Sequence, residues 1–141
     1  MPETIVIIDD APEVVRVAEV SLQRAGGYTV FTADNAEAGL ALLHEHHPRL
    51  LLLDVMMPHT TGPELLARMR QDPSLASTAV MFMSAVCGPE QITALEATGA
   101  IAVIAKPFRP VQLVARVRET LAAMCPAAPL VTEPSLEIPD A

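Results

Sequence analysis

The sequence has few aromatic residues, only two cysteines and no long hydrophobic run. Aromatic residues make up 3% of the 141 residues and Trp is absent, so aliphatic side chains must fill any core. The longest apolar runs are far too short to cross a bilayer, and no basic segment precedes an apolar one at the N-terminus, as a secretory signal would require. Two cysteines, Cys87 and Cys125, do not make a secreted disulfide framework. We therefore expect a cytoplasmic protein whose cysteines are reduced.

Positive charge is also scarce. The chain has 9 basic and 17 acidic residues, which gives a formal net charge of −8. A chain this acidic, without a basic cluster, is a poor binder of nucleic acid and is repelled by anionic membranes. Hydrophobic residues still make up 51% of the sequence, enough for a buried core, and the length fits one domain.

Short apolar segments alternate with helical patterns along residues 1–125. Four segments are continuously apolar, as strands buried on both faces of a parallel sheet are: Ile5–Ile8, Leu50–Leu53, Val80–Met83 and Ile101–Ile104. A fifth, Tyr28–Thr32, alternates with polar residues and suits a sheet edge. Apolar residues recur every three or four positions in the intervening segments Ala11–Ala25, Asn35–His46, Pro63–Arg70, Pro89–Thr98 and Pro110–Met124. This order predicts an α/β fold of the flavodoxin-like (βα)5 type. We expect a five-stranded parallel sheet in the order 2-1-3-4-5 with helices on both faces.

Residues 126–141 differ from the rest of the chain. They hold four prolines and three acids, and no base. We expect a mobile appendage to a domain that ends at residue 125. The alternative is a docking segment that uses the apolar side chains of Leu130, Val131, Leu136 and Ile138.

Chemically active residues follow the predicted strands. Asp9 and Asp10 follow the first strand, Asp54 the third, Ser84 the fourth and Lys106, the only lysine of the chain, the fifth. The ligand site of such a fold lies beyond the carboxyl ends of the strands, so these side chains should meet there. Crowded carboxylates repel one another, and a hard cation such as Mg²⁺ relieves this. A cation, a lysine, a hydroxyl and a nucleophilic carboxylate are the components of phosphoryl transfer.

Each residue also has an ordinary structural interpretation. One of Asp9 and Asp10 can cap the first helix, Ser84 can be a turn residue and Lys106 a solvated surface residue. Their joint occurrence at four strand ends favours a functional site over these separate structural roles. The cluster His44, His46 and His47 is better explained by the favourable position of imidazoles at a helix C-terminus than by a metal site. Similarly, His59 is expected to be an exposed loop residue, and Cys87 has no partner for redox chemistry.

Four motifs in this order resemble the receiver domain of two-component response regulators over residues 3–124. They are IVIIDDAPEV, LLLLDVMMPHTTG, FMSA and AKPF, each containing or following a hydrophobic strand. The resemblance implies that Asp54 accepts a phosphoryl group from a histidine kinase or phosphotransfer protein. It also implies that Asp9, Asp10, Asp54 and the backbone carbonyl of Met56 bind Mg²⁺, that Ser84 and Lys106 contact the phosphate, and that the Lys106–Pro107 peptide is cis.

The chain departs from the family pattern at Val103. Many receivers have a Tyr or Phe there, which swings inward on activation, so we expect a smaller response in the fifth strand and coupling through Ser84 and the fourth helix. Because only sixteen residues follow Cys125, we expect a single-domain regulator that is not an enzyme and that signals through an unknown downstream protein. A phosphate relay or sink is the alternative. A flavin carrier is disfavoured because the first strand is followed by two acids and no glycine. The sequence leaves a homodimer open.

Overall fold

A computed structural model describes residues 3–86 and 88–124 of the chain. Five parallel strands form one sheet in the order β2-β1-β3-β4-β5. The strands are β1 (Thr4–Ile8), β2 (Thr29–Ala33), β3 (Leu50–Asp54), β4 (Ala79–Ser84) and β5 (Ala102–Ala105). The predicted topology is confirmed, including the position of the more polar strand β2 at an edge.

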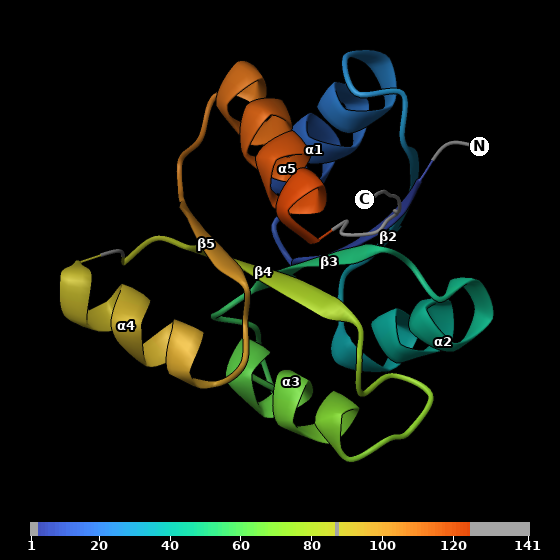
Figure 1. The fold of residues 1–141 in the computed structure, drawn as a ribbon, viewed down its shortest axis with the longest axis vertical. Helices are drawn as coiled ribbons and strands as arrows, with labels where there is room; N and C mark the ends of the chain where they lie inside the picture. The colour runs from blue at the N-terminus through green and yellow to red at the C-terminus, as the bar shows by residue number, and fades with distance from the viewer. Residues whose placement is uncertain (1–2, 87, 125–141) are drawn as a thin grey trace, which may run out of the picture.

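Five helices cover the two faces of the sheet (Figure 1). They are α1 (Pro12–Arg24), α2 (Ala36–His46), α3 (Gly62–Arg70), α4 (Pro89–Ala97) and α5 (Pro110–Met124). Helices α1 and α5 lie side by side on one face, and α2, α3 and α4 cover the other. All five follow the carboxyl end of a strand, so the loops that begin them share one edge of the sheet.

Successive strand residues alternate between two hydrophobic clusters. In β1, Val6 and Ile8 pack with the core beneath α2, α3 and α4, whereas Ile5 and Ile7 pack with the core beneath α1 and α5. The four central leucines of β3 divide in the same way, and all of them are fully buried. Burial on both faces explains why these strands read as continuous apolar runs rather than as alternating ones.

The element boundaries differ from the predicted ones by one or two residues. Helix α1 begins at Pro12, and its N-cap is Ala11, without a capping side chain. The expectation that Asp9 or Asp10 caps this helix is therefore wrong. Helix α3 begins one residue early, at Gly62, because Thr61 and Glu64 form a reciprocal capping box. Strand β5 begins one residue late, and Ile101, which was predicted to lie in it, is exposed.

Residues 125–141 lie outside the described residues, so the predicted boundary at residue 125 and the predicted mobility of the tail stay predictions. Within the described residues, none of the helices is both long enough and apolar enough to span a membrane.

Candidate functional site

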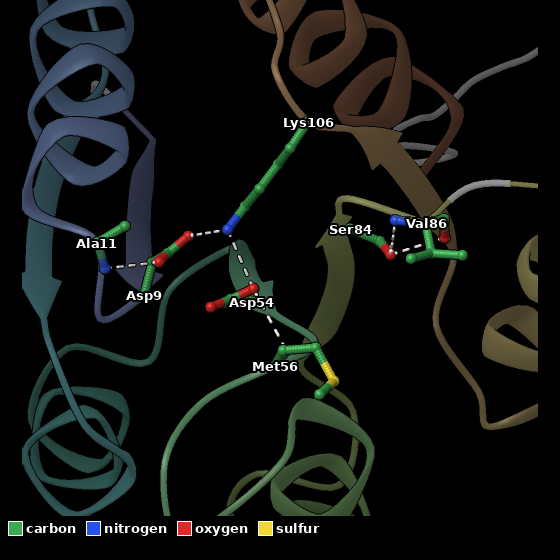
Figure 2. A network of polar contacts seen from close by, with 7 residues as sticks. All are labelled: Asp9, Ala11, Asp54, Met56, Ser84, Val86 and Lys106. Atoms are coloured by element: carbon green, nitrogen blue, oxygen red, sulfur yellow. Dashed lines mark hydrogen bonds and ion pairs between the residues drawn. The ribbon is translucent and has the colours of Figure 1, made fainter.

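The carboxyl edge of the sheet brings together the side chains that the sequence singled out. Asp9 directly follows β1, Asp54 and Ser84 are the last residues of β3 and β4, and Lys106 directly follows β5. Figure 2 shows the Lys106 side chain extending from the end of β5 so that its ammonium group lies between Asp9 and Asp54. Residues as far apart as positions 9 and 106 thus meet at one point, as the strand order predicted.

Two ion pairs hold the centre of this site. The Nζ atom of Lys106 lies 2.7 Å from Oδ2 of Asp9 and 3.0 Å from Oδ1 of Asp54. Both carboxylates are almost completely buried, and the side chain of Lys106 is only 16% exposed. Backbone amides complete the arrangement: Ala11 N–H donates to Oδ1 of Asp9, and Met56 N–H donates to Oδ1 of Asp54 at 3.3 Å.

Within residues 3–86 and 88–124, Asp9, Asp10 and Asp54 form the one group of three or more His, Cys, Asp or Glu residues whose arrangement can hold a metal ion. Each offers a carboxylate oxygen, and these oxygens lie within 4.8 Å of one another. Oδ2 of Asp9 is buried, and although it lies close to Lys106, it accepts no aligned hydrogen bond from the described residues. An all-carboxylate donor set with an incompletely satisfied buried oxygen suits a hard divalent cation.

Burial controls the protonation of the central carboxylate. Desolvation, together with the negative charge of Asp9, raises the pKa of Asp54 from 3.8 to about 6, against the opposing hydrogen bond and positive charge of Lys106. For Lys106, desolvation lowers the pKa, but its close contacts with the carboxylates of Asp9 and Asp54 prevail and leave the pKa above its usual value. Without a metal ion, the single positive charge of Lys106 therefore does not fully compensate the negative charges of the buried Asp9 and Asp54.

This imbalance predicts a pH-dependent stability of the metal-free protein. Between pH 3.8 and about 6, Asp54 is ionised in the unfolded chain but still holds a proton in the folded one. Because the folded protein binds this proton more tightly than the unfolded chain does, protonation of Asp54 stabilises the fold at low pH. This stabilisation is lost as the pH rises through the window. In a chelating buffer, we expect Asp54→Asn to become progressively more stable than the wild type from about pH 4 to about pH 6. Denaturant unfolding of both proteins across this range measures the difference, and a pH-independent difference would contradict the shift.

Ser84 lies at the same edge, where it contacts the loop that leads to α4. Its hydroxyl donates to the carbonyl of Val86 at 2.8 Å and accepts from the Val86 N–H at 3.1 Å. The Met56 side chain is 74% exposed beside the site. The Lys106–Pro107 peptide is cis, as the resemblance implied. Val103 pairs with Phe82 in the sheet and is buried in the core on the side of α4.

The histidines of α2 and its C-cap make contacts outside the acidic group. Nε2 of His44 lies 3.2 Å from Oδ2 of Asp72, and the ring of His46 stacks on that of Phe31 with an angle of 9° between the ring planes. His47 is the left-handed C-cap of α2, and His59 is exposed in the loop before α3. None of them belongs to a metal-binding group of three or more within the described part of the chain.

The sequence interpretation missed two supporting features. Val86 holds the Ser84 hydroxyl, and Gly62 packs so closely that an added Cβ would lie 2.5 Å from the carbonyl oxygen of Asp54. The capping box of Thr61 and Glu64, which begins helix α3 beside this close approach, was recognisable from its spacing. No sequence signal marked Val86.

Comparisons with known proteins agree with this geometry. Residues 5–118 match the family model described as response regulator receiver domain. The chain is 36% identical over 121 residues to the phosphate regulon transcriptional regulatory protein PhoB of Pseudomonas aeruginosa, covering 84% of this chain and 52% of PhoB. It is 34% identical over 123 residues to the response regulator Rre1 of Synechocystis, covering 86% of this chain and 52% of Rre1. The chain thus spans about half the length of these curated relatives.

Solved structures show the same fold. The chemotaxis response regulator CheY4 of Vibrio cholerae superposes with a TM-score of 0.79 at 25% identity, over 85% of this chain and 99% of CheY4. The response regulator DrrB of Thermotoga maritima gives a TM-score of 0.76 at 26% identity, over 88% of this chain and 54% of DrrB. Given the match over most of the described chain, this protein belongs to the response regulator receiver domain family of two-component systems.

Proposed function

We propose that this receiver domain accepts a phosphoryl group on Asp54 from the phosphohistidine of a histidine kinase or phosphotransfer protein. The observation that carries the proposal is the contact of the Asp54 carboxylate with the only lysine of the chain at the end of a buried strand. Such a carboxylate is a competent nucleophile when ionised, and the nearby ammonium compensates the charge of the incoming phosphate oxygens.

The transfer is a substitution at phosphorus. An oxygen of Asp54 forms a bond to phosphorus while the phosphorus–nitrogen bond of the donor histidine breaks, and the leaving imidazole nitrogen keeps the bonding electron pair and takes up a proton. The product is an acyl phosphate on Asp54. Lys106 is placed to move from the carboxylate of Asp54 to the new phosphate, because its flexible side chain already contacts Asp54 at 3.0 Å.

Mg²⁺ is the cation that we propose for the acidic group. Asp9, Asp10 and Asp54 would hold it together with the backbone carbonyl of Met56, and when bound it would neutralise negative charge on the phosphoryl oxygens. Asp10 is exposed and so can bind a hydrated ion, whereas buried Asp9 already has Lys106 as a partner. On this geometry, Asp10 is the more accessible ligand.

The signal leaves the site through Ser84. When its hydroxyl turns to donate to a phosphate oxygen, its hydrogen bond to the Val86 carbonyl is lost, which loosens the start of the loop before α4. We propose that a downstream protein recognises the altered loop and helix in the cytoplasm, with no enzymatic output from the receiver itself. In a pure phosphate relay, which is the second candidate, the same surface would not have to change.

A phosphotransfer experiment with Lys106→Ala tests this function. We expect the wild type to take radioactive phosphate from a phosphorylated histidine kinase and to shift its backbone amide resonances around Ser84 and α4. Lys106→Ala should still accept phosphate, because Asp54 remains, but should lose most of the shifts around Ser84, because the phosphate then lacks its cationic partner.

The matched control is Arg68→Ala, which removes an exposed cation that pairs with Glu37 outside the site. This variant should resemble the wild type in both measurements. Phosphate-induced shifts that are the same in Lys106→Ala and the wild type would remove Lys106 from the mechanism. Phosphate on a residue other than Asp54 would overturn the proposed function.

A further inference from the structure

An apolar groove lies between α1 and α5 and is covered by no described residue. It has a volume of about 420 Å³ and is lined by Glu13, Arg16, Val17, Val20, Ser21 and Pro110. Val17 is 40% exposed, and Val111, next to the groove residue Pro110, is 81% exposed. Water-exposed valines at these positions gain free energy when another apolar segment covers them.

Basic residues outnumber acidic ones on the two helices that border this groove, although the chain as a whole is acidic. Of the nine basic residues, five lie on α1 and α5 or directly before α5: Arg16, Arg24, Arg109, Arg116 and Arg118. The same segments carry three acids, Glu13, Glu19 and Glu119, which leaves an excess of two positive charges. By contrast, the charged residues of α4 are both acids, Glu90 and Glu96. The face formed by α1 and α5 is therefore suited to a segment that is both apolar and acidic.

The chain itself contains such a segment. Residues 126–141 have three acids, no base and the four aliphatic residues Leu130, Val131, Leu136 and Ile138. They lie outside the described residues and follow Met124, the last residue of α5. We propose that this tail binds in the groove between α1 and α5 of the same molecule, with Leu130 and Val131 against Val17 and Val20.

Chain length sets the first tail residue that can reach the groove. Met124 and Pro110 are the two ends of α5, about 21 Å apart at about 1.5 Å per helical residue. The six residues from Met124 to Leu130 span about 20 Å when extended, at about 3.3 Å each. A tail that runs back along α5 thus reaches the groove at Leu130. The next acid, Glu133, then lies near Arg16 and Arg109.

Pro110 and Glu13 border the groove, and neither belongs to the acidic group Asp9, Asp10 and Asp54. This inference does not depend on which residue is phosphorylated, because it concerns a surface and a segment outside the acidic group.

A paramagnetic label on the tail tests the contact directly. In the chain of residues 1–141, Cys87 and Cys125 are replaced by Ser, and Thr132→Cys carries the spin label. We expect strong broadening of the amide resonances of Val17, Val20 and Val111. The same chain with Leu130→Ser and Val131→Ser should lose most of that broadening, and so should a sample at about 1 M salt, where the Debye length falls to about 3 Å.

Charge reversal provides the matched control. Glu133→Arg should weaken the broadening, and Glu133→Arg combined with Arg16→Glu should restore it, since the pair is then reversed rather than lost. Broadening that appears only in unlabelled ¹⁵N protein mixed with labelled protein would assign the groove to a second copy. The absence of broadening at Val17 and Val20 in the labelled chain, or its confinement to the surface around Ile101 and Ala123, would overturn the proposal.

Discussion

Replacing Asp54 by Asn will abolish phosphorylation by a small acyl phosphate donor such as acetyl phosphate. The amide has nearly the same shape as the carboxylate, so the fold should survive, but its oxygen is a much weaker nucleophile and forms no stable acyl phosphate. In the wild type, Asp54 is the buried carboxylate that contacts both Lys106 and the amide of Met56. We expect no acid-labile phosphate above background in the variant, measured by intact mass and by hydroxylamine sensitivity.

Asp9→Asn is the informative control for this result. Asp9 is as deeply buried as Asp54 and contacts the same lysine, so proximity to Lys106 alone does not distinguish the two as phosphoacceptors. If Asp54 is the acceptor, Asp9→Asn slows phosphorylation, but the phosphate still forms on Asp54. Hydroxylamine-sensitive phosphate in Asp54→Asn would assign the nucleophile to another carboxylate, and hydroxylamine-resistant phosphate would point to a hydroxyl such as that of Ser84.

The strand ends were predictable because hydrophobic patterning and connection rules constrain parallel sheets closely. Leu50–Leu53 reads as a strand buried on both faces, and the structure confirms it. Once the order of the strands was set, the edge at which Asp54 and Lys106 meet followed from the direction of the chain. The separation of the site residues in sequence was therefore no obstacle to predicting their proximity.

The finer arrangement depended on side-chain choices that patterning does not determine. One of Asp9 and Asp10 was expected to cap helix α1, but the Asp9 carboxylate accepts from the amide of Ala11, which precedes the helix, and pairs with Lys106. Either partner satisfies a buried carboxylate, so the sequence alone could not choose between them. The exposure of Ile101 was missed for a similar reason, because an apolar residue at a strand boundary can lie on either side of it.

Binding of Mg²⁺ to the acidic group Asp9, Asp10 and Asp54 will raise the free energy of unfolding. At a hundredfold excess over the dissociation constant, one site that is formed only in the folded state adds about 2.7 kcal/mol to the free energy of unfolding. For a domain of this size, about 2–4 °C per kcal/mol is typical, so the melting temperature should rise by several degrees. Calorimetry with increasing Mg²⁺ in a buffer near pH 7.5 measures the effect, because Asp54, with its pKa of about 6, is then ionised.

Asp10→Asn should remove most of this gain, and Asp34→Asn should leave it unchanged. Both residues are exposed acids that follow neighbouring strands, but only Asp10 has an oxygen within 4.8 Å of those of Asp9 and Asp54. Their comparison therefore separates coordination from a general loss of negative charge, which would weaken Mg²⁺ binding to a similar extent in both variants. The metal must also compete with Lys106, which lies 2.7 Å from Asp9 and 3.0 Å from Asp54. Removing that ammonium in Lys106→Ala should make the stabilisation by Mg²⁺ larger at a given concentration. A melting temperature of the wild type that does not respond to millimolar Mg²⁺ would show that the lysine alone satisfies the buried carboxylates.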